Sequence, residues 1–115
     1  MLGEPKNDSD FATELSWENL DREKLVKFLG DYFKDKPVHK AYLFGSFARN
    51  NADKKSDIDI LVDLYYKNGI ASEYSKMVID LKQILKRKIH LVTLNSVSPF
   101  IIENINKEKI LIYER

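Results

Sequence analysis

The chain has 115 residues, of which 43% are hydrophobic and 32% are charged, and this size and composition are those of one globular domain. Its net charge of +1 gives no general attraction to nucleic acid or to membrane surfaces, so nucleic acid is not indicated as a partner. The absence of cysteine excludes disulfides and thiolate metal sites, and no apolar run approaches the roughly 18 residues of a membrane span.

The first residues of the sequence are more polar than the rest. Residues 1–15 are expected to form a polar N-terminal arm, and residues 16–115 a single domain. The first residues lack the basic-then-apolar order of a signal peptide. We therefore expect a cytoplasmic protein without a membrane partner.

Apolar periodicity predicts helices and strands along this domain. The first helix is predicted over residues 22–33, because Asp21 can cap it and Leu20 and Leu25 are placed as a hydrophobic staple. A strand over residues 38–44 then carries the chain to Gly45. The later elements are a short helix over 47–49, a strand over 57–63, a helix over 72–86, a strand over 89–94, a helix beginning at Pro99 and a strand over 109–113.

The two later helices are each expected to bury an apolar side. Ser72 is placed to begin the helix over residues 72–86, and Ser98 to cap the helix that starts at Pro99. The predicted apolar sides are Tyr74, Val78, Leu81 and Leu85 in the former, and Phe100, Ile101, Ile102 and Ile105 in the latter.

Two carboxylates stand at the start of the predicted strand over residues 57–63. Successive strand side chains point to opposite faces, so Asp57 and Asp59 share one face of the sheet. Carboxylates side by side repel each other and usually hold a cation, and hard oxygen ligands suit Mg²⁺ bridging to phosphates, with Mn²⁺ as an alternative. This spacing predicts a metal site at Asp57 and Asp59.

Upstream of the carboxylates, Gly45 and Ser46 interrupt an apolar strand. Glycine lets the backbone turn tightly and approach a ligand closely. Ser46 supplies a hydroxyl and opens the short helix, whose free N–H groups favour an anion. Arg49 is placed either to reach a phosphate or to form a structural ion pair with one of the acids. We therefore predict a phosphate at this turn, beside the metal.

The segments GSFAR (residues 45–49) and SDIDILV (residues 56–62) together resemble the GS…SDxD signature of the minimal nucleotidyltransferases (MNT). This family, which includes the MntA-like antitoxins of HEPN/MNT pairs, belongs to the DNA polymerase beta-like nucleotidyltransferase superfamily. The resemblance implies the nucleotidyltransferase fold, an α+β fold with a small mixed β-sheet of about four strands and helices packed mainly on one face. The site residues that it implies are Asp57 and Asp59 for the metal, and Gly45, Ser46, Arg49 and Ser56 for the nucleotide.

The predicted strand over residues 89–94 departs from the family pattern. Relatives usually carry a third aspartate here, where this chain has His90. In two-metal phosphoryl transfer the third carboxylate often helps to activate the attacking hydroxyl, whereas histidine is a softer, neutral ligand. Three hypotheses follow: His90 is the general base of a one-metal site, it marks a chain that binds Mg-nucleotide weakly without catalysing, or it is unconnected with the site.

The resemblance leaves two functions open. The first is an Mg²⁺-dependent nucleotidyltransferase, with Asp57, Asp59 and His90 as catalytic residues, that transfers AMP from ATP to a hydroxyl acceptor on a HEPN toxin. The alternative is a catalytically impaired binding module of MNT fold that acts as an antitoxin or regulatory subunit by contact. ATP and a helical HEPN-type protein are the expected partners, and a homo-oligomer is also open.

Overall fold

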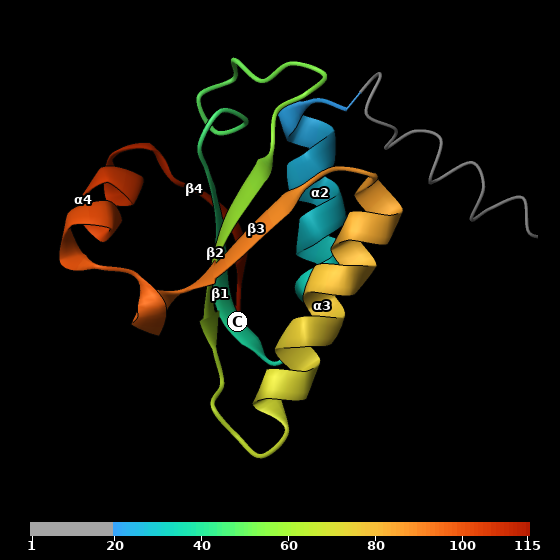
Figure 1. Cartoon of the computed structure of the whole chain (residues 1–115), viewed down its shortest axis with the longest axis vertical. Coiled ribbons are helices and arrows are strands. Elements are labelled where there is room, and N and C mark those ends of the chain that lie inside the picture. Colours follow the sequence, from blue (N-terminus) through green and yellow to red (C-terminus); the bar gives the residue numbers. More distant parts are fainter. Residues whose placement is uncertain (1–19) are drawn as a thin grey trace, which may run out of the picture.

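A computed structural model of the protein describes residues 20–115 (Figure 1). The predicted arm over residues 1–15 lies outside the described residues. Within them, no helix has the length and apolar character needed to cross a membrane. The elements in chain order are α2 (Arg22–Phe33), β1 (Val38–Phe44), β2 (Ile58–Leu64), α3 (Ile70–Leu85), β3 (Ile89–Thr93), the short 3-10 helix η1 (Leu94–Ser96), α4 (Pro99–Glu108) and β4 (Ile110–Glu114).

The four strands form one mixed sheet in the order β3-β2-β1-β4. β1 is antiparallel to both of its neighbours, β2 and β4, whereas β2 and β3 run parallel. The helices α2 and α3 lie side by side on one face of the sheet, and α4 stands on the opposite side (Figure 1). The predicted α+β fold with a small mixed sheet is confirmed.

The hydrophobic core lies between the sheet and the pair α2 and α3. As predicted, the carboxylate of Asp21 caps α2, accepting a hydrogen bond of 2.9 Å from the backbone N–H of Lys24. This cap satisfies one of the four N–H groups that a helix start leaves unpaired. Buried core side chains come from α2 (Leu25, Phe28, Leu29, Phe33), from α3 (Met77, Leu81, Leu85) and from the first three strands (Val38, Ala41, Leu43, Ile58, Ile60, Val62, Ile89, Leu91).

The register of the sheet brings three distant parts of the chain to one point. In the antiparallel pair of β1 and β2, Phe44 lies opposite Asp59, so the turn that follows β1 begins beside this carboxylate. In the parallel pair of β2 and β3, Asp59 lies opposite His90. The end of β1 and the beginnings of β2 and β3 therefore meet at Asp59.

Residues 47–49 do not form the predicted short helix. Residues 45–50 form consecutive hydrogen-bonded turns, in which the N–H of Arg49 donates to the carbonyl of Gly45 and that of Asn51 to the carbonyl of Ser46, both at 3.0 Å. Asn50 takes the left-handed conformation expected of it, with φ of 62°. A left-handed residue this early stops the segment after one turn, so a helix cannot propagate.

The helix α3 begins at Ile70, two residues before the predicted start. Its N-cap is Gly69 with φ of 85°, and no side chain caps it, so Ser72 lies within its first turn rather than before it. The N–H of Glu73 donates to the carbonyl of Gly69 at 3.1 Å and starts the helical ladder. Met77, which the predicted apolar side omitted, is buried along with Leu81 and Leu85.

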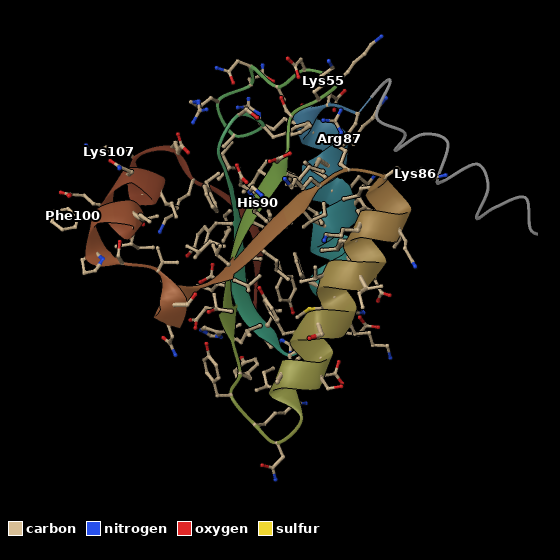
Figure 2. The ribbon with its side chains drawn as sticks, viewed as in Figure 1. Lys55, Lys86, Arg87, His90, Phe100 and Lys107 are labelled. Carbon is tan, nitrogen blue, oxygen red and sulfur yellow. The ribbon has the colours of Figure 1, made fainter. Side chains whose placement is uncertain are left out.

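The helix α4 starts as predicted, with Ser98 as cap and Pro99 as first residue, but it buries little of its apolar side. Ile105 is buried, whereas Phe100 is 83% exposed and Ile101 is 54% exposed. Phe100 lies on the outer side of α4, away from the sheet (Figure 2). Two cavities lie between α4 and the sheet, so α4 does not pack down on the sheet as α2 and α3 do.

Candidate active site

Two carboxylates and one imidazole form the centre of the site. Asp57 directly precedes β2, Asp59 is its second residue, and His90 is the second residue of β3. The ring nitrogen Nδ1 of His90 lies 2.9 Å from Oδ1 of Asp59, and Nε2 lies 3.5 Å from Oδ2 of Asp57. Because both carboxylates contact the same ring, they lie on the same side of the sheet. His90 is therefore part of this cluster, and the hypothesis that it is unconnected with the site is wrong.

Gly45 and Asp59 approach each other so closely that no side chain fits at position 45. Gly45 has φ of 78°, in the left-handed region that favours glycine. A Cβ atom built there would lie 2.2 Å from Oδ2 of Asp59. The Asp59 carboxylate thus occupies the volume that any other residue at position 45 would fill.

Two buried side chains and two arginines hold the turn after β1 in place. Phe47 and Ala48 are buried, and Nη1 of Arg22 donates a hydrogen bond of 2.8 Å to the carbonyl of Ala48. The guanidinium of Arg87 lies over the ring of Phe47, 5.0 Å from its centroid. These contacts hold the backbone around Ser46 in a fixed position beside the carboxylates.

Ser56 holds the loop before β2 rather than lining a cavity. Its hydroxyl accepts a hydrogen bond of 2.8 Å from the N–H of Asp53 and donates to the Asp53 carboxylate at 3.1 Å. Arg87 donates to the carbonyl oxygens of Asp53 and Ser56 at 3.0 and 2.7 Å, and it lies beside this loop near the top of Figure 2. The structure therefore does not bring Ser56 together with the other residues of the predicted nucleotide site.

Glu108, at the end of α4, is a site residue that the sequence analysis missed. Its Oε2 accepts a hydrogen bond of 2.7 Å from the N–H of Gly45, and its Oε1 forms an ion pair of 2.8 Å with Nη1 of Arg49. The ion pair of Arg49 is thus with Glu108, not with the carboxylates of β2. A glutamate in the last turn opposes the helix dipole, and this was the one sequence signal for a tertiary partner.

The hydrogen bonds to Glu108 determine its charge. Partial burial alone would raise the pKa of this carboxyl, but the hydrogen bonds from Gly45 and Arg49 outweigh it and hold the pKa below its usual value. Glu108 is therefore an anion at neutral pH, placed against an N–H group and a guanidinium.

Two cavities meet at Asp59. The first, of about 410 Å³, contains five of the predicted site residues, namely Gly45, Ser46, Arg49, Asp57 and Asp59. The second, of about 550 Å³, contains Asp59 and His90, and its other walls are mostly apolar. Both are bounded by Phe44, Ile101 and Ile105, so α4 and the end of β1 form walls common to the two.

The residues present suit a cation that brings part of its own ligand shell. Among residues 20–115, no three or more His, Asp or Glu side chains are arranged as a complete metal-binding cluster. The two carboxylates Asp57 and Asp59 provide hard oxygen donors on one side of an open cavity. Mg²⁺ is commonly bound in this way, by one or two carboxylates together with waters and substrate phosphates. The donor set fits Mg²⁺ with a nucleotide, and does not form an all-protein cage.

Partial burial disfavours the charged form of the Asp59 carboxyl. It raises the pKa of the Asp59 carboxyl above its ordinary value, although the hydrogen bond and charge of His90 oppose this effect. The folded protein thus holds a proton on Asp59 more tightly than the unfolded chain does. Ionisation of Asp59 therefore costs stability as pH rises from the ordinary aspartate pKa through the raised one.

Replacing Asp59 with asparagine is expected to stabilise the fold while removing a site carboxylate. The asparagine side chain keeps an acceptor for His90 but carries no charge, so the free energy of unfolding at pH 7 should rise by about 0.5–1 kcal/mol. Thermal unfolding of Asp59→Asn and wild type at pH 7 and pH 4 checks this. The advantage of the variant should be smaller at pH 4, where a larger fraction of Asp59 in the wild type is protonated than at pH 7; an advantage that grows at pH 4 would contradict the raised pKa.

Comparisons with known proteins identify the family of this chain. Residues 23–115 match the family model for polymerase beta nucleotidyltransferases. The chain is 35% identical over 91 residues to the "Putative protein adenylyltransferase MJ1379" of Methanocaldococcus jannaschii, covering 77% of this chain and 88% of that protein.

The fold is also similar to solved toxin–antitoxin structures. One, with AMP-PNP, has a TM-score of 0.62 and 24% identity, covering 84% of this chain and 75% of that one. Another, a variant of the MntA-HpeT toxin–antitoxin, has a TM-score of 0.59 and 26% identity, covering 84% and 74%. The family match includes the turn, both carboxylates, His90 and Glu108, and the chain belongs to the polymerase beta nucleotidyltransferase family.

Proposed function

We propose that the protein is an Mg²⁺-dependent adenylyltransferase that transfers AMP from ATP to a hydroxyl group of a partner protein. The observation that carries this proposal is the first cavity, where Asp57 and Asp59 face the Gly45 turn and Arg49. One side of this cavity suits a divalent cation and the other suits phosphate. The name of its relative, "Putative protein adenylyltransferase MJ1379", supports adenylyl transfer to protein.

In this proposal each residue of the cavity has a defined task. Asp57 and Asp59 hold Mg²⁺, with Mn²⁺ as a substitute, and the ion when bound neutralises phosphate charge. Gly45, Ser46 and Arg49 bind the phosphates through N–H, hydroxyl and guanidinium groups. The acceptor oxygen bonds to the α-phosphorus, the bond from that phosphorus to the oxygen bridging to the β-phosphate breaks, and pyrophosphate leaves.

His90 is the proposed acceptor of the proton that the attacking hydroxyl loses. Its Nδ1 is hydrogen-bonded to Asp59, which orients the ring, while Nε2 is only loosely held at 3.5 Å from Asp57. Histidine is the side chain most often used as a general base, and a carboxylate commonly fixes its orientation. The second cavity, which His90 lines, would then receive the acceptor hydroxyl.

The proposed protein acceptor is a helical HEPN-type toxin. The support comes from the 26% identical MntA-HpeT chain, which is part of a toxin–antitoxin. We place the reaction in the cytoplasm, where the proposed donor ATP is available.

A second candidate function rests on the same His90 contacts. The imidazole touches both carboxylates, so it stands where an ion bound between them would compete with it. A chain in which His90 takes the place of a third acid would then act as an antitoxin by contact alone. The retained Asp57, Asp59 and Gly45 favour the enzyme over this binding module.

The test uses ATP labelled on one phosphate at a time, with Mg²⁺ and a HEPN-type protein as the candidate acceptor. Adenylyl transfer predicts that the acceptor gains label from ATP labelled at the α-phosphate and none from ATP labelled at the γ-phosphate. Label from the γ-phosphate would indicate phosphorylation instead. If the acceptor gains no label from either form of ATP and the toxin is still neutralised, the binding module is favoured.

Replacing His90 with aspartate separates the two functions further. If His90 is the base of a working enzyme, His90→Asp removes an oriented imidazole, and transfer should fall about a hundredfold or more. If His90 marks a degraded site, the restored carboxylate should raise transfer above that of the wild type. The rate of α-label incorporation measures both outcomes, and Mg²⁺-dependent ATP binding by calorimetry shows whether the site is intact.

A further inference from the structure

The phosphate-binding groups of the first cavity already have an anionic partner within the chain. Glu108 accepts from the N–H of Gly45 at 2.7 Å and pairs with Arg49 at 2.8 Å. Under the proposed function these two donors belong to the phosphates of ATP. The carboxylate therefore lies where part of the triphosphate is expected to bind.

A carboxylate and a phosphate compete directly for such donors. Both are anions that accept charge-assisted hydrogen bonds from N–H and guanidinium groups. The single hydrogen of the Gly45 N–H cannot bond fully to two acceptors, and two anions within a few ångströms of each other repel. Glu108 is negatively charged in this position, since its hydrogen bonds lower the pKa of its carboxyl.

The surroundings of Glu108 allow it to leave. Its side chain is 25% exposed and lies beside the cavity of about 410 Å³. The helix that carries it buries only Ile105 among its described residues. β4 begins two residues after Glu108 and is paired to β1, so the backbone there is fixed, but rotation of the glutamate side chain alone frees both donors.

From this arrangement we infer that Glu108 restrains its own nucleotide site: its carboxylate occupies the phosphate donors in the free protein, and a nucleoside triphosphate binds by displacing it. The inference rests on the proposed function, because it concerns the same cavity. Glu108 thus sets how tightly the site binds triphosphate. If Glu108 instead only positions Arg49 for the phosphate, its removal would have the opposite effect on affinity.

The test compares Glu108→Gln with Glu103→Gln, a control on the exposed side of the same helix that changes net charge equally. Calorimetric titration with ATP and Mg²⁺ should give a Kd about tenfold lower for Glu108→Gln than for wild type, corresponding to about 1.4 kcal/mol. Glu103→Gln should bind as wild type does. Titration with inorganic triphosphate should give the same order, because the competition is for phosphate.

Glu108→Asp provides a second variant that keeps the charge but shortens the side chain, so the carboxylate cannot reach both donors. It should also bind ATP more tightly, and it carries the test if Glu108→Gln does not fold. Equal or weaker ATP binding by folded Glu108 variants, with wild type binding normally, overturns this inference and leaves the proposed function standing. Absence of ATP binding in wild type and variants alike overturns both.

Discussion

Replacing Gly45 with alanine is expected to abolish Mg²⁺-dependent ATP binding, although it adds only one methyl group. The new Cβ would lie 2.2 Å from Oδ2 of Asp59, a separation that atoms do not tolerate. Either the turn shifts or the Asp59 carboxylate rotates away, and both movements break the first cavity. Misplacement of a catalytic group by about 1 Å can cost about a hundredfold in rate, so transfer should fall by at least this factor.

The chain provides a matched control in Gly69→Ala. Gly69 has φ of 85°, close to the 78° of Gly45, but a Cβ there would meet no atom within 4 Å. Both alanine variants bear the same left-handed strain, about 1–2 kcal/mol in the free energy of unfolding. Only Gly45→Ala should also lose ATP binding, measured by calorimetry on folded protein. Equal losses of ATP binding in both variants would mean that backbone strain, not the contact with Asp59, is responsible.

The second large effect is expected from Asp57→Asn, which should abolish transfer and leave the fold intact. Asp57 precedes β2, and its contact with His90 is a long one of 3.5 Å. Loss of its charge therefore disturbs little packing, but it removes one of two proposed oxygen donors to Mg²⁺. Mutations of groups that merely support metal ligands cost about 10-fold to 100-fold, so loss of a ligand should cost more than 100-fold.

Asp63→Asn is the control for this substitution. Asp63 is a residue of β2, is paired in register with Lys40, and lines neither of the two cavities. Calorimetry with ATP, with and without Mg²⁺, should find Mg²⁺-dependent binding in Asp63→Asn and none in Asp57→Asn. Transfer that continues at the wild-type rate in Asp57→Asn would exclude Asp57 as a metal ligand.

The parts of the site that the sequence predicted are those encoded by local geometry. Alternation along a strand is enough to place Asp57 and Asp59 on one face, and a glycine that interrupts an apolar run is enough to place a turn. The position of His90 against Asp59 follows once β3 is paired with β2 in parallel register. Their roles as metal ligands, base and phosphate groups stay predictions, which the variants above test.

Tertiary contacts determined what the sequence could not predict. Glu108 reaches Gly45 from 63 positions away, and no local pattern encodes such a contact. Ser56 carries a family motif, but its hydroxyl is used within its own loop by Asp53. The apolar residues of α4 suggested a buried side, yet only Ile105 of this helix is buried, because two cavities lie between the helix and the sheet. The positions of Glu108 and α4 depend on contacts between distant parts of the chain, whereas Ser56 is held by a residue only three positions away.

The place of Glu108 in the chain also sets an order of events during translation. The turn, the carboxylates and His90 are synthesised before α4 and β4. β4 pairs with β1 across most of the domain, and such non-local pairings form late in folding. A nascent chain that has grown only to β3 therefore has the Gly45 N–H and Arg49 without the carboxylate that later bonds to them, and its β1 is still an open sheet edge. The same short segment that closes this edge brings Glu108 to the turn, so the sheet and the proposed nucleotide site are completed together.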